Sequence, residues 1–139
     1  MTTKEYLSRA FEIDRRLQIK YRRFKVMQDR ASGSYYRNES VTVNQLYLQS
    51  RMEEYALKAI ELQAEITEDK ALLEAVRSEI KQAIRSTGNE LYVSILDMRY
   101  LQYMSWEEIC SQTGYSRSNA YRIHGIALDL IVLPEKSHE

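Results

Sequence analysis

The sequence is poor in the residues that break helices or cross-link a chain. Its 139 residues include four glycines, one proline and one cysteine. Because proline and glycine are the strongest helix breakers, little before Pro134 opposes long helices, and four scattered glycines cannot build a phosphate-binding loop. The single Cys110 excludes a disulfide within the chain. These absences favour an all-α fold and a reducing, cytoplasmic location.

Long apolar runs and a net charge are missing as well. No run approaches the roughly 20 apolar residues that cross a bilayer, and the first residues lack the apolar centre of a signal peptide, so we expect no membrane partner. The 20 basic residues equal the 20 acidic ones in number, which excludes a uniformly basic nucleic-acid coat protein. No set of nucleophile, base or metal ligands stands out. We therefore expect a protein that is not an enzyme and that carries no cofactor or metal.

What the sequence does contain is two long heptad-like patterns. Apolar residues recur at alternating spacings of three and four between residues 4 and 30, and again from about residue 44 to residue 85. A period near 3.5 is typical of coiled coils. Lys20 interrupts the first pattern and Asp69 the second. The two stripes can pack as an antiparallel hairpin within one chain or form a homo-oligomer, and the sequence does not choose between these arrangements.

The predicted loop near residues 31–43 limits how such a hairpin can be aligned. Lys20 lies 11 residues before residue 31, whereas Asp69 lies 26 residues after residue 43. Placing these two side chains opposite each other would require a connector much longer than this loop, given usual connection lengths. We therefore expect a different register.

The zero net charge is a sum of unlike segments. Residues 1–38 hold 10 basic and 4 acidic side chains, residues 39–90 hold 6 and 10, and residues 91–139 hold 4 and 6. Two arginine pairs, Arg15 with Arg16 and Arg22 with Arg23, lie seven residues apart and therefore on one helix face. They are candidates for contact with the DNA backbone or an acidic partner. The alternative is loose pairing with glutamates of the second long helix, which adds little stability.

The C-terminal part carries a series of helix start and stop signals. We divide the chain into a two-helix coiled-coil hairpin over residues 1–87, a three-helix domain over residues 88–133 and a tail over residues 134–139. A first helix of the domain is predicted over residues 91–103. Ser105 and Glu108 form a capping box before a short helix over residues 106–113, and Gly114 then allows a sharp turn before Ser116 caps a helix that runs to about residue 130.

Two helices joined by a short turn around a glycine are typical of a helix-turn-helix, whose second helix can enter the major groove of double-stranded DNA, about 12 Å wide. The inward places require small or apolar side chains, and they hold Ile109, Ala120 and Ile123. Trp106 is expected to be a core aromatic, and His124 to lie on the helix surface. The outward places at the start of the last helix hold Arg117, Ser118, Tyr121 and Arg122. Arginine can bind guanine through two hydrogen bonds, serine can bind several bases, and tyrosine can contact a thymine methyl group or a phosphate.

The stretch LDMRYLQYMSWEEICSQTGYSRSNAYRIHGIAL, residues 96–128, resembles region four of sigma-70-type factors. It is more similar still to small phage and prophage transcriptional regulators that carry this domain behind an N-terminal helical hairpin. The resemblance implies RNA polymerase as a partner, and base contacts at the start of the last helix, beside its cap Ser116. The base-reading residues would be Arg117, Ser118, Tyr121 and Arg122. The places that contact the DNA backbone correspond to Ser105 and Trp106.

The sequence departs from the sigma pattern at informative places. Ser118 and Asn119 stand where sigma factors usually have an acidic and then a basic residue. Ile126, Asp129 and Leu130 occupy places that are commonly basic. The resemblance therefore carries over neither a promoter preference nor strong phosphate binding by this helix. It also does not extend to the sigma region that grips polymerase and melts promoter DNA.

The leading hypothesis is a sequence-specific DNA-binding transcriptional regulator of phage or prophage type. Two alternatives remain open from the sequence. A small-terminase-like DNA-packaging protein also joins a helix-turn-helix to an oligomerising coiled coil, and a polymerase-binding protein could use a degenerate helix-turn-helix without binding DNA. The assembly size and the presence or absence of DNA binding distinguish the three.

Overall fold

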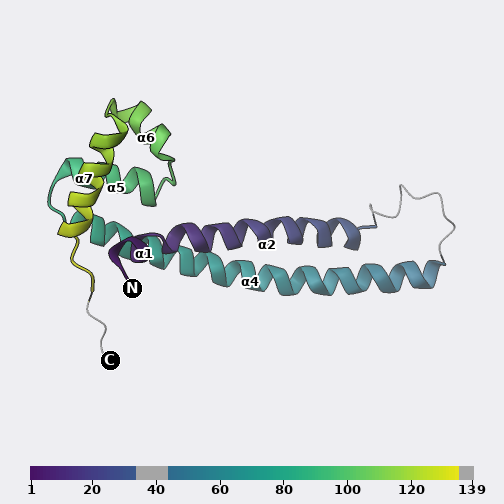
Figure 1. Ribbon diagram of the computed structural model, residues 1–139. Helices are drawn as coiled ribbons and strands as arrows, with labels where there is room; N and C mark the ends of the chain where they lie inside the picture. Colours follow the sequence, from purple (N-terminus) through teal and green to yellow (C-terminus); the bar gives the residue numbers. More distant parts are fainter. Residues whose placement is uncertain (34–43, 135–139) are drawn as a thin grey trace. The chain divides into compact units, whose positions relative to one another are not determined.

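The structure is a computed structural model that describes residues 1–33 and 44–134 (Figure 1). The described residues form helices and no strand, which confirms the predicted all-α class. The predicted loop near residues 31–43 lies outside the described residues from residue 34 onward, and the predicted tail over residues 134–139 from residue 135. The helices are α1 (Thr3–Leu7), α2 (Arg9–Ala31), α4 (Gln45–Arg85), α5 (Glu90–Tyr100), α6 (Trp106–Thr113) and α7 (Arg117–Leu130).

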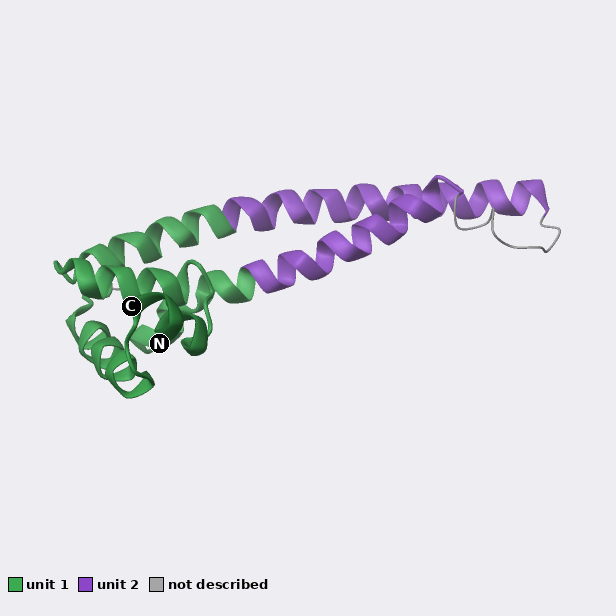
Figure 2. Ribbon diagram, turned by 90° about the horizontal axis from the view of Figure 1, so that it is seen from above, with its two compact units in different colours: residues 1–13, 73–139 green, residues 14–72 purple. Residues whose placement is uncertain are grey.

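The chain divides into two compact units, which Figure 2 shows in green and purple. Unit 1 comprises Met1–Ile13 and Leu73–Glu139, and unit 2 comprises Asp14–Leu72. The long helices α2 and α4 each supply residues to both units. The predicted division at residue 88 lies between the end of α4 and the start of α5. The boundaries between the two compact units lie elsewhere, inside α2 and inside α4.

The predicted first helix begins in two parts. Thr2 caps α1 through a reciprocal capping box with Glu5, and α1 ends at Leu7. The Ser8 hydroxyl donates to the Lys4 carbonyl at 2.7 Å, and Ser8 keeps right-handed helical angles, so the interruption before α2 is slight. Leu7 is fully buried, whereas Tyr6, which lies four residues before Ala10 and fits the alternation of three and four, is only half-buried. The interruption therefore shifts the buried stripe by one residue at the start of the chain.

In unit 2 the predicted stripes of α2 and α4 are buried within one chain. Leu17 from α2 is buried with Tyr55, Ala59, Leu62 and Ile66 from α4. The helices run antiparallel, because Lys20 contacts Asp69 whereas Arg30, farther along α2, contacts the earlier residue Tyr55. The alternation of three and four thus predicts the buried side of both helices correctly.

The register of this pair differs from the prediction, because Lys20 and Asp69 do lie opposite each other. Lys20 Nζ is 2.9 Å from Asp69 Oδ2. Thirteen residues separate Ala31 from Gln45, and an extended chain of that length spans roughly 40 Å. The ten α4 residues before Tyr55 rise by only about 15 Å. The connector is therefore long enough for this register, and usual connection lengths were the wrong guide.

Unit 1 is built around an apolar core to which several parts of the chain contribute. Ile95 and Leu96 from α5, Ile109 from α6 and Ala127 from α7 are buried in it. The start of the chain and the last turns of α4 add further members, namely Leu7, Ala10, Ile13, Val76, Ile80, Ala83 and Ile84. The helix predicted over residues 91–103 ends at Tyr100, and Tyr103 follows with a left-handed φ of 60°. One core therefore joins α5, α6 and α7 to the first residues of the chain and to the end of α4.

Candidate nucleic-acid interface

The local geometry of α6, the turn and α7 follows the sequence signals. The Ser105 hydroxyl accepts from the Glu108 N–H at 3.1 Å, and the Glu108 carboxylate accepts from the Ser105 N–H at 2.9 Å. Gly114 adopts a left-handed φ of 80°, and its N–H donates to the Cys110 carbonyl at 2.9 Å. The Ser116 hydroxyl accepts from the Asn119 N–H at 3.1 Å. The predicted capping box, turn and helix cap are confirmed.

The inward side of this segment is buried as predicted. Ile109, Ala120 and Ile123 lie in the interior of unit 1. Thr113, the half-buried last residue of α6, uses its hydroxyl in the turn: it donates to the Ile109 carbonyl at 2.7 Å and accepts from the Tyr115 N–H at 3.3 Å. The threonine therefore satisfies backbone groups where a leucine could not.

The predicted base-reading side chains lie together on the exposed side of α7. Arg117, Ser118, Tyr121 and Arg122 are all exposed, as are the two caps Ser105 and Ser116. Tyr121 retains 45% of its accessible surface. Arg122 Nη2 donates to Asn119 Oδ1 at 2.8 Å, whereas Arg117 has no hydrogen bond or ion pair to any described residue. The first two turns of α7 thus present two guanidinium groups, a hydroxyl and a phenol to solvent.

Trp106 connects the start of α6 to this face. Its half-buried ring lies edge-on to Tyr121, with 4.9 Å between ring centres, and edge-on to His124, with 4.8 Å. The Arg99 guanidinium lies 5.0 Å from the centre of the indole ring. Trp106 is therefore a packing residue that restricts the orientation of Tyr121, and it directly follows the α6 cap Ser105.

His124 does not lie on the surface as predicted, since it is only 8% exposed. The Tyr100 hydroxyl and His124 Nε2 are hydrogen-bonded at 2.7 Å. Burial, with smaller contributions from the positive charges of Lys4 and Arg99, lowers the pKa of His124 to about 4, and burial raises the pKa of Tyr100 to about 12. Both side chains are uncharged at neutral pH. The signal for this burial was present: His124 lies four residues after Ala120 and three before Ala127, which is a helical core spacing.

The arginine pairs of α2 belong to unit 2 and have unlike surroundings. All four side chains are exposed. Arg16 Nη2 lies 3.4 Å from Asp69 Oδ1, so Arg16 and Lys20 of α2 share the same carboxylate of α4. Arg15, Arg22 and Arg23 have no ion-pair partner among the residues that the structure describes. Pairing with the second long helix therefore accounts for one of the four arginines.

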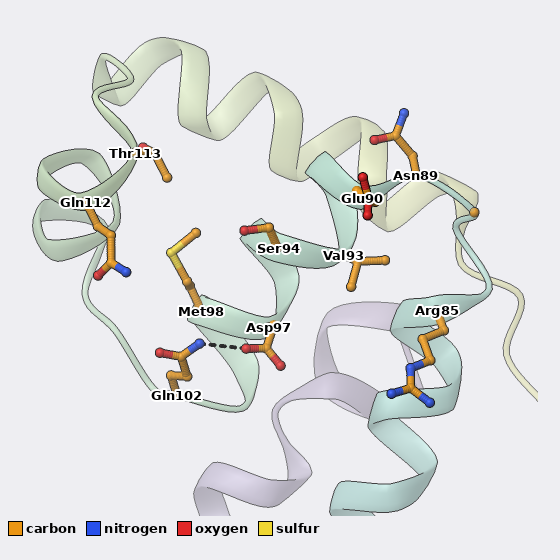
Figure 3. A pocket seen from close by; sticks show the side chains of 11 residues that line it. Arg85, Asn89, Glu90, Val93, Ser94, Asp97, Met98, Gln102, Gln112 and Thr113 are labelled. Carbon is orange, nitrogen blue, oxygen red and sulfur yellow. Dashed lines mark hydrogen bonds between the residues drawn. The ribbon is translucent and has the colours of Figure 1, made fainter.

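A pocket lined by charged, polar and apolar side chains lies in unit 1 (Figure 3). Its lining includes Arg85 at the end of α4, Glu90 and Asp97 on α5, and Gln112 on α6. Gln102 Nε2 donates to Asp97 Oδ2 at 2.6 Å, and Figure 3 shows these two side chains pointing toward each other. Side chains of opposite charge surround the pocket, and no nucleophile is paired with a base in its lining. Across residues 1–33 and 44–134, no three histidine, cysteine or acidic side chains converge as metal ligands would.

The chain matches no family model, and no curated protein or solved structure is similar enough to it to count as a match. None of the described helices is both long and apolar enough to cross a membrane.

Proposed function

We propose that the chain is a non-enzymatic, sequence-specific transcriptional regulator that reads double-stranded DNA, of the kind that resembles sigma-70 region four in phages and prophages. In this proposal α6, the turn and α7 are a helix-turn-helix carried behind a long antiparallel hairpin. One observation carries the proposal: along α7, Ala120 and Ile123 are buried while Arg117, Tyr121 and Arg122 are exposed. This is the two-sided pattern that a recognition helix requires.

The exposed residues suit base contacts in both position and chemistry. Residues 117, 118, 121 and 122 follow helical spacing, so their side chains share one face over two turns. A helix with side chains is about 10–12 Å across, which matches the major groove. Arg117 can donate two hydrogen bonds to guanine without first breaking an ion pair to a described residue. Arg122 would exchange its bond to Asn119 for one to DNA.

The two serine caps suit contacts with the DNA backbone. The hydroxyls of Ser105 and Ser116 each accept one bond from a backbone N–H. Each hydroxyl still has its own proton to donate, and a phosphate oxygen is an acceptor. In the proposed complex these serines and the edge of Trp106 flank the base-reading residues. Because α7 carries only two basic residues, phosphate attraction must come in part from other surfaces or from RNA polymerase as a partner.

The proposal is tested by selecting DNA from a random double-stranded library with the full-length chain. We expect the wild type to enrich a defined sequence and the Arg117→Ala, Arg122→Ala double variant to enrich none. Each arginine that pairs with guanine contributes about 1–3 kcal/mol of discrimination, so losing both lowers specific affinity by roughly a hundredfold or more. A matched control removes two exposed lysines of α4, Lys70→Ala and Lys81→Ala, and should retain enrichment of the same sequence.

Three outcomes would contradict the proposal. Unchanged enrichment by the double variant would show that α7 does not read the bases. A wild type that enriches no sequence but binds RNA polymerase would identify a polymerase-binding protein. Assemblies of eight or more chains that bind DNA without sequence preference would identify a packaging protein.

A further inference from the structure

The outer side of α2 in unit 2 presents apolar side chains to solvent. The stripe of α2 that faces α4 is buried at Leu17 and half-buried at Lys20, Phe24 and Met27. On another side of the same helix, Ile19 is 49% exposed and Val26 is 42% exposed. The two residues are seven apart and therefore lie on one face, about 10 Å apart along the helix axis. We call Ile19 and Val26 the α2 outer stripe.

Arginines surround the α2 outer stripe. Arg15, Arg22 and Arg23 each lie three or four residues from Ile19 or Val26, which places them next to it on the helix surface. All three are exposed and have no ion-pair partner among the described residues. Between Asp14 and Arg30 the helix carries seven basic and two acidic residues. The α2 outer stripe is thus an apolar centre with a basic rim.

The outer side of α4 has the same layout with the opposite charge. Leu57 is 64% exposed and Ile60 is 67% exposed, and Ala64 continues this apolar face. Leu57 and Ala64 are seven residues apart, as Ile19 and Val26 are, so we call Leu57, Ile60 and Ala64 the α4 outer stripe. The exposed carboxylates beside it are Glu53, Glu61 and Glu68, together with Glu54, which pairs with Arg51 and Lys58 of the same helix. Between Gln45 and Leu72 the helix carries six acidic and three basic residues.

We propose that the α2 outer stripe of one copy of this chain packs against the α4 outer stripe of a second copy. The apolar centres have matching lengths, and the arginine rim meets the glutamate rim. The proposal rests on this combination: each outer stripe is apolar where outer positions of a coiled coil are usually polar, and the charged residues beside the two stripes have opposite signs. The stripes between α2 and α4 are less available for this contact, because their residues are buried or half-buried within the chain.

This contact is heterologous, because it joins two different surfaces. Both surfaces remain available at the outer ends of a pair, so the assembly can grow beyond a dimer or close into a ring. The proposal does not depend on the function of α7, because none of its residues belongs to the helix-turn-helix. A DNA backbone could also meet the arginine rim, but it would leave Ile19, Val26 and the acidic counterpart on α4 unexplained. DNA at this rim is therefore an outcome of the test.

The test reverses each rim separately and then mixes the two variants, without DNA. The first variant carries Arg15→Glu, Arg22→Glu and Arg23→Glu, and the second carries Glu53→Lys, Glu61→Lys and Glu68→Lys. In the first variant both rims are acidic, and in the second both are basic, so each should repel copies of itself. The equimolar mixture again offers opposite rims at both contacts. Sedimentation velocity of the full-length chains measures the association.

We expect the wild type to associate with rising concentration, each variant alone to remain a monomer, and the mixture to associate again. Reversing the rim should raise the dissociation constant at least about tenfold, and salt should weaken the wild-type contact. The Lys81→Glu, Arg85→Glu variant changes exposed charges of unit 1 in the same direction as the first variant and should associate like the wild type. Helical circular dichroism should be unchanged in all variants, because every altered residue is exposed.

Replacing the apolar centre gives a second readout that does not alter charge. Ile19→Gln with Val26→Gln should weaken association like a rim reversal, whereas Gln18→Ala on the same helix should not. A wild type that stays monomeric overturns the proposal, as does a mixture that fails to associate. Loss of DNA binding in the first variant, without any change in mass relative to the wild type, would assign the rim to DNA instead. Failure of α7 to select a sequence would leave these measurements unaffected.

Discussion

The two compact units differ in the charge of the polar side chains that they enclose: the pair in unit 2 is ionised, and the pair in unit 1 is uncharged. In unit 2, Lys20 Nζ lies 2.9 Å from Asp69 Oδ2 and 3.1 Å from Glu65 Oε1. The hydrogen bond with Asp69 raises the pKa of Lys20, and the same bond lowers the pKa of Asp69, so both groups stay ionised. In unit 1, burial keeps Tyr100 and His124 uncharged, with a pKa of about 12 for the phenol and about 4 for the imidazole.

The difference shows that the neighbours of a buried polar residue decide its charge. Lys20 has two carboxylates beside it, which offset the cost of leaving water. His124 has no described carboxylate partner, and the nearby positive charges of Lys4 and Arg99 add to the effect of burial. An acid solution should therefore destabilise the two units in different pH ranges.

The largest effect should come from removing an isoleucine from each interior. Ile109 in unit 1 and Ile66 in unit 2 are both almost fully buried. Ile109→Ala should lower the free energy of unfolding by about 4 kcal/mol, because it leaves a cavity that several helices enclose. Ile66→Ala should cost about 2–3 kcal/mol, because a seam between two helices can collapse more easily.

Urea denaturation followed by circular dichroism measures both values, and Leu46→Ala at an exposed site outside the α4 outer stripe is the control, with a cost below about 0.5 kcal/mol. A larger loss for Ile66→Ala than for Ile109→Ala would reverse the comparison and would show that the seam is the more rigidly packed of the two interiors.

The next effect concerns pH and unit 1. The folded pKa of His124, about 4, is lower than its ordinary value of 6.5, so the unfolded chain binds the proton more tightly. The contribution is fully present above pH 6.5 and is lost as the pH falls toward 4. The loss should approach about 3 kcal/mol at most. The free energy of unfolding, measured between pH 7 and pH 4.5, reports it.

His124→Gln removes the titrating group and should flatten the pH dependence over this range, although the variant is less stable because its contact with Tyr100 changes. Nuclear magnetic resonance gives the pKa directly. A His124 ring that titrates near pH 6.5 would contradict the buried neutral state.

A smaller effect should separate the charged pair of unit 2 from the neutral pair of unit 1. Asp69→Asn removes the charge that holds Lys20 and should cost about 1–2 kcal/mol. In the wild type the folded pKa of Asp69 is lowered, so its contribution is present above about pH 4 and is lost only as the pH falls further. Unit 2 should therefore resist acid at a pH where unit 1 has already weakened.

The double replacement Lys20→Met with Asp69→Leu tests the same pair by removing both charges at once. Exchanging a part-buried ion pair for apolar residues is often neutral or stabilising, so this variant should be at least as stable as the wild type and should not respond to pH in this range. A double variant less stable than the wild type would show that the pair contributes net stability.

Features with local causes could be predicted from the sequence. A cap, a left-handed glycine and an i, i+3 or i, i+4 spacing each involve residues within one or two turns. Ser105, Gly114 and Ser116 therefore predicted the bounds of α6 and α7, which the structure confirms. The alternation of three and four predicted the buried stripes for the same reason.

Features with distant causes could not be predicted in this way. The helical spacing of His124 indicates that it faces the core, but Tyr100 and Trp106, which contact it there, come from other helices and have no local signal. The opposition of Lys20 and Asp69 depends on a connector whose length is compatible with several registers, and no local signal selects one.

The smallest predicted effect compares a helix cap in each unit. The Ser116 hydroxyl caps α7 in unit 1, and Asn44 Oδ1 caps α4 in unit 2 by accepting from the N–H groups of Leu46 at 2.8 Å and Tyr47 at 3.2 Å. Ser116→Ala should cost about 1 kcal/mol, because the first turn of α7 carries the buried Ala120 and cannot fray without opening the core. Asn44→Ala should cost less than about 0.3 kcal/mol in global stability, since Leu46 and Tyr47 are exposed and the first turn of α4 can fray alone.

In the Asn44→Ala variant, hydrogen exchange should be faster only at the start of α4. The control is Ser118→Ala, which removes a serine of α7 that does not cap the helix. Equal global costs would mean that the start of α4 is held by contacts beyond its cap, and that the packing contrast between the units does not extend to their helix ends.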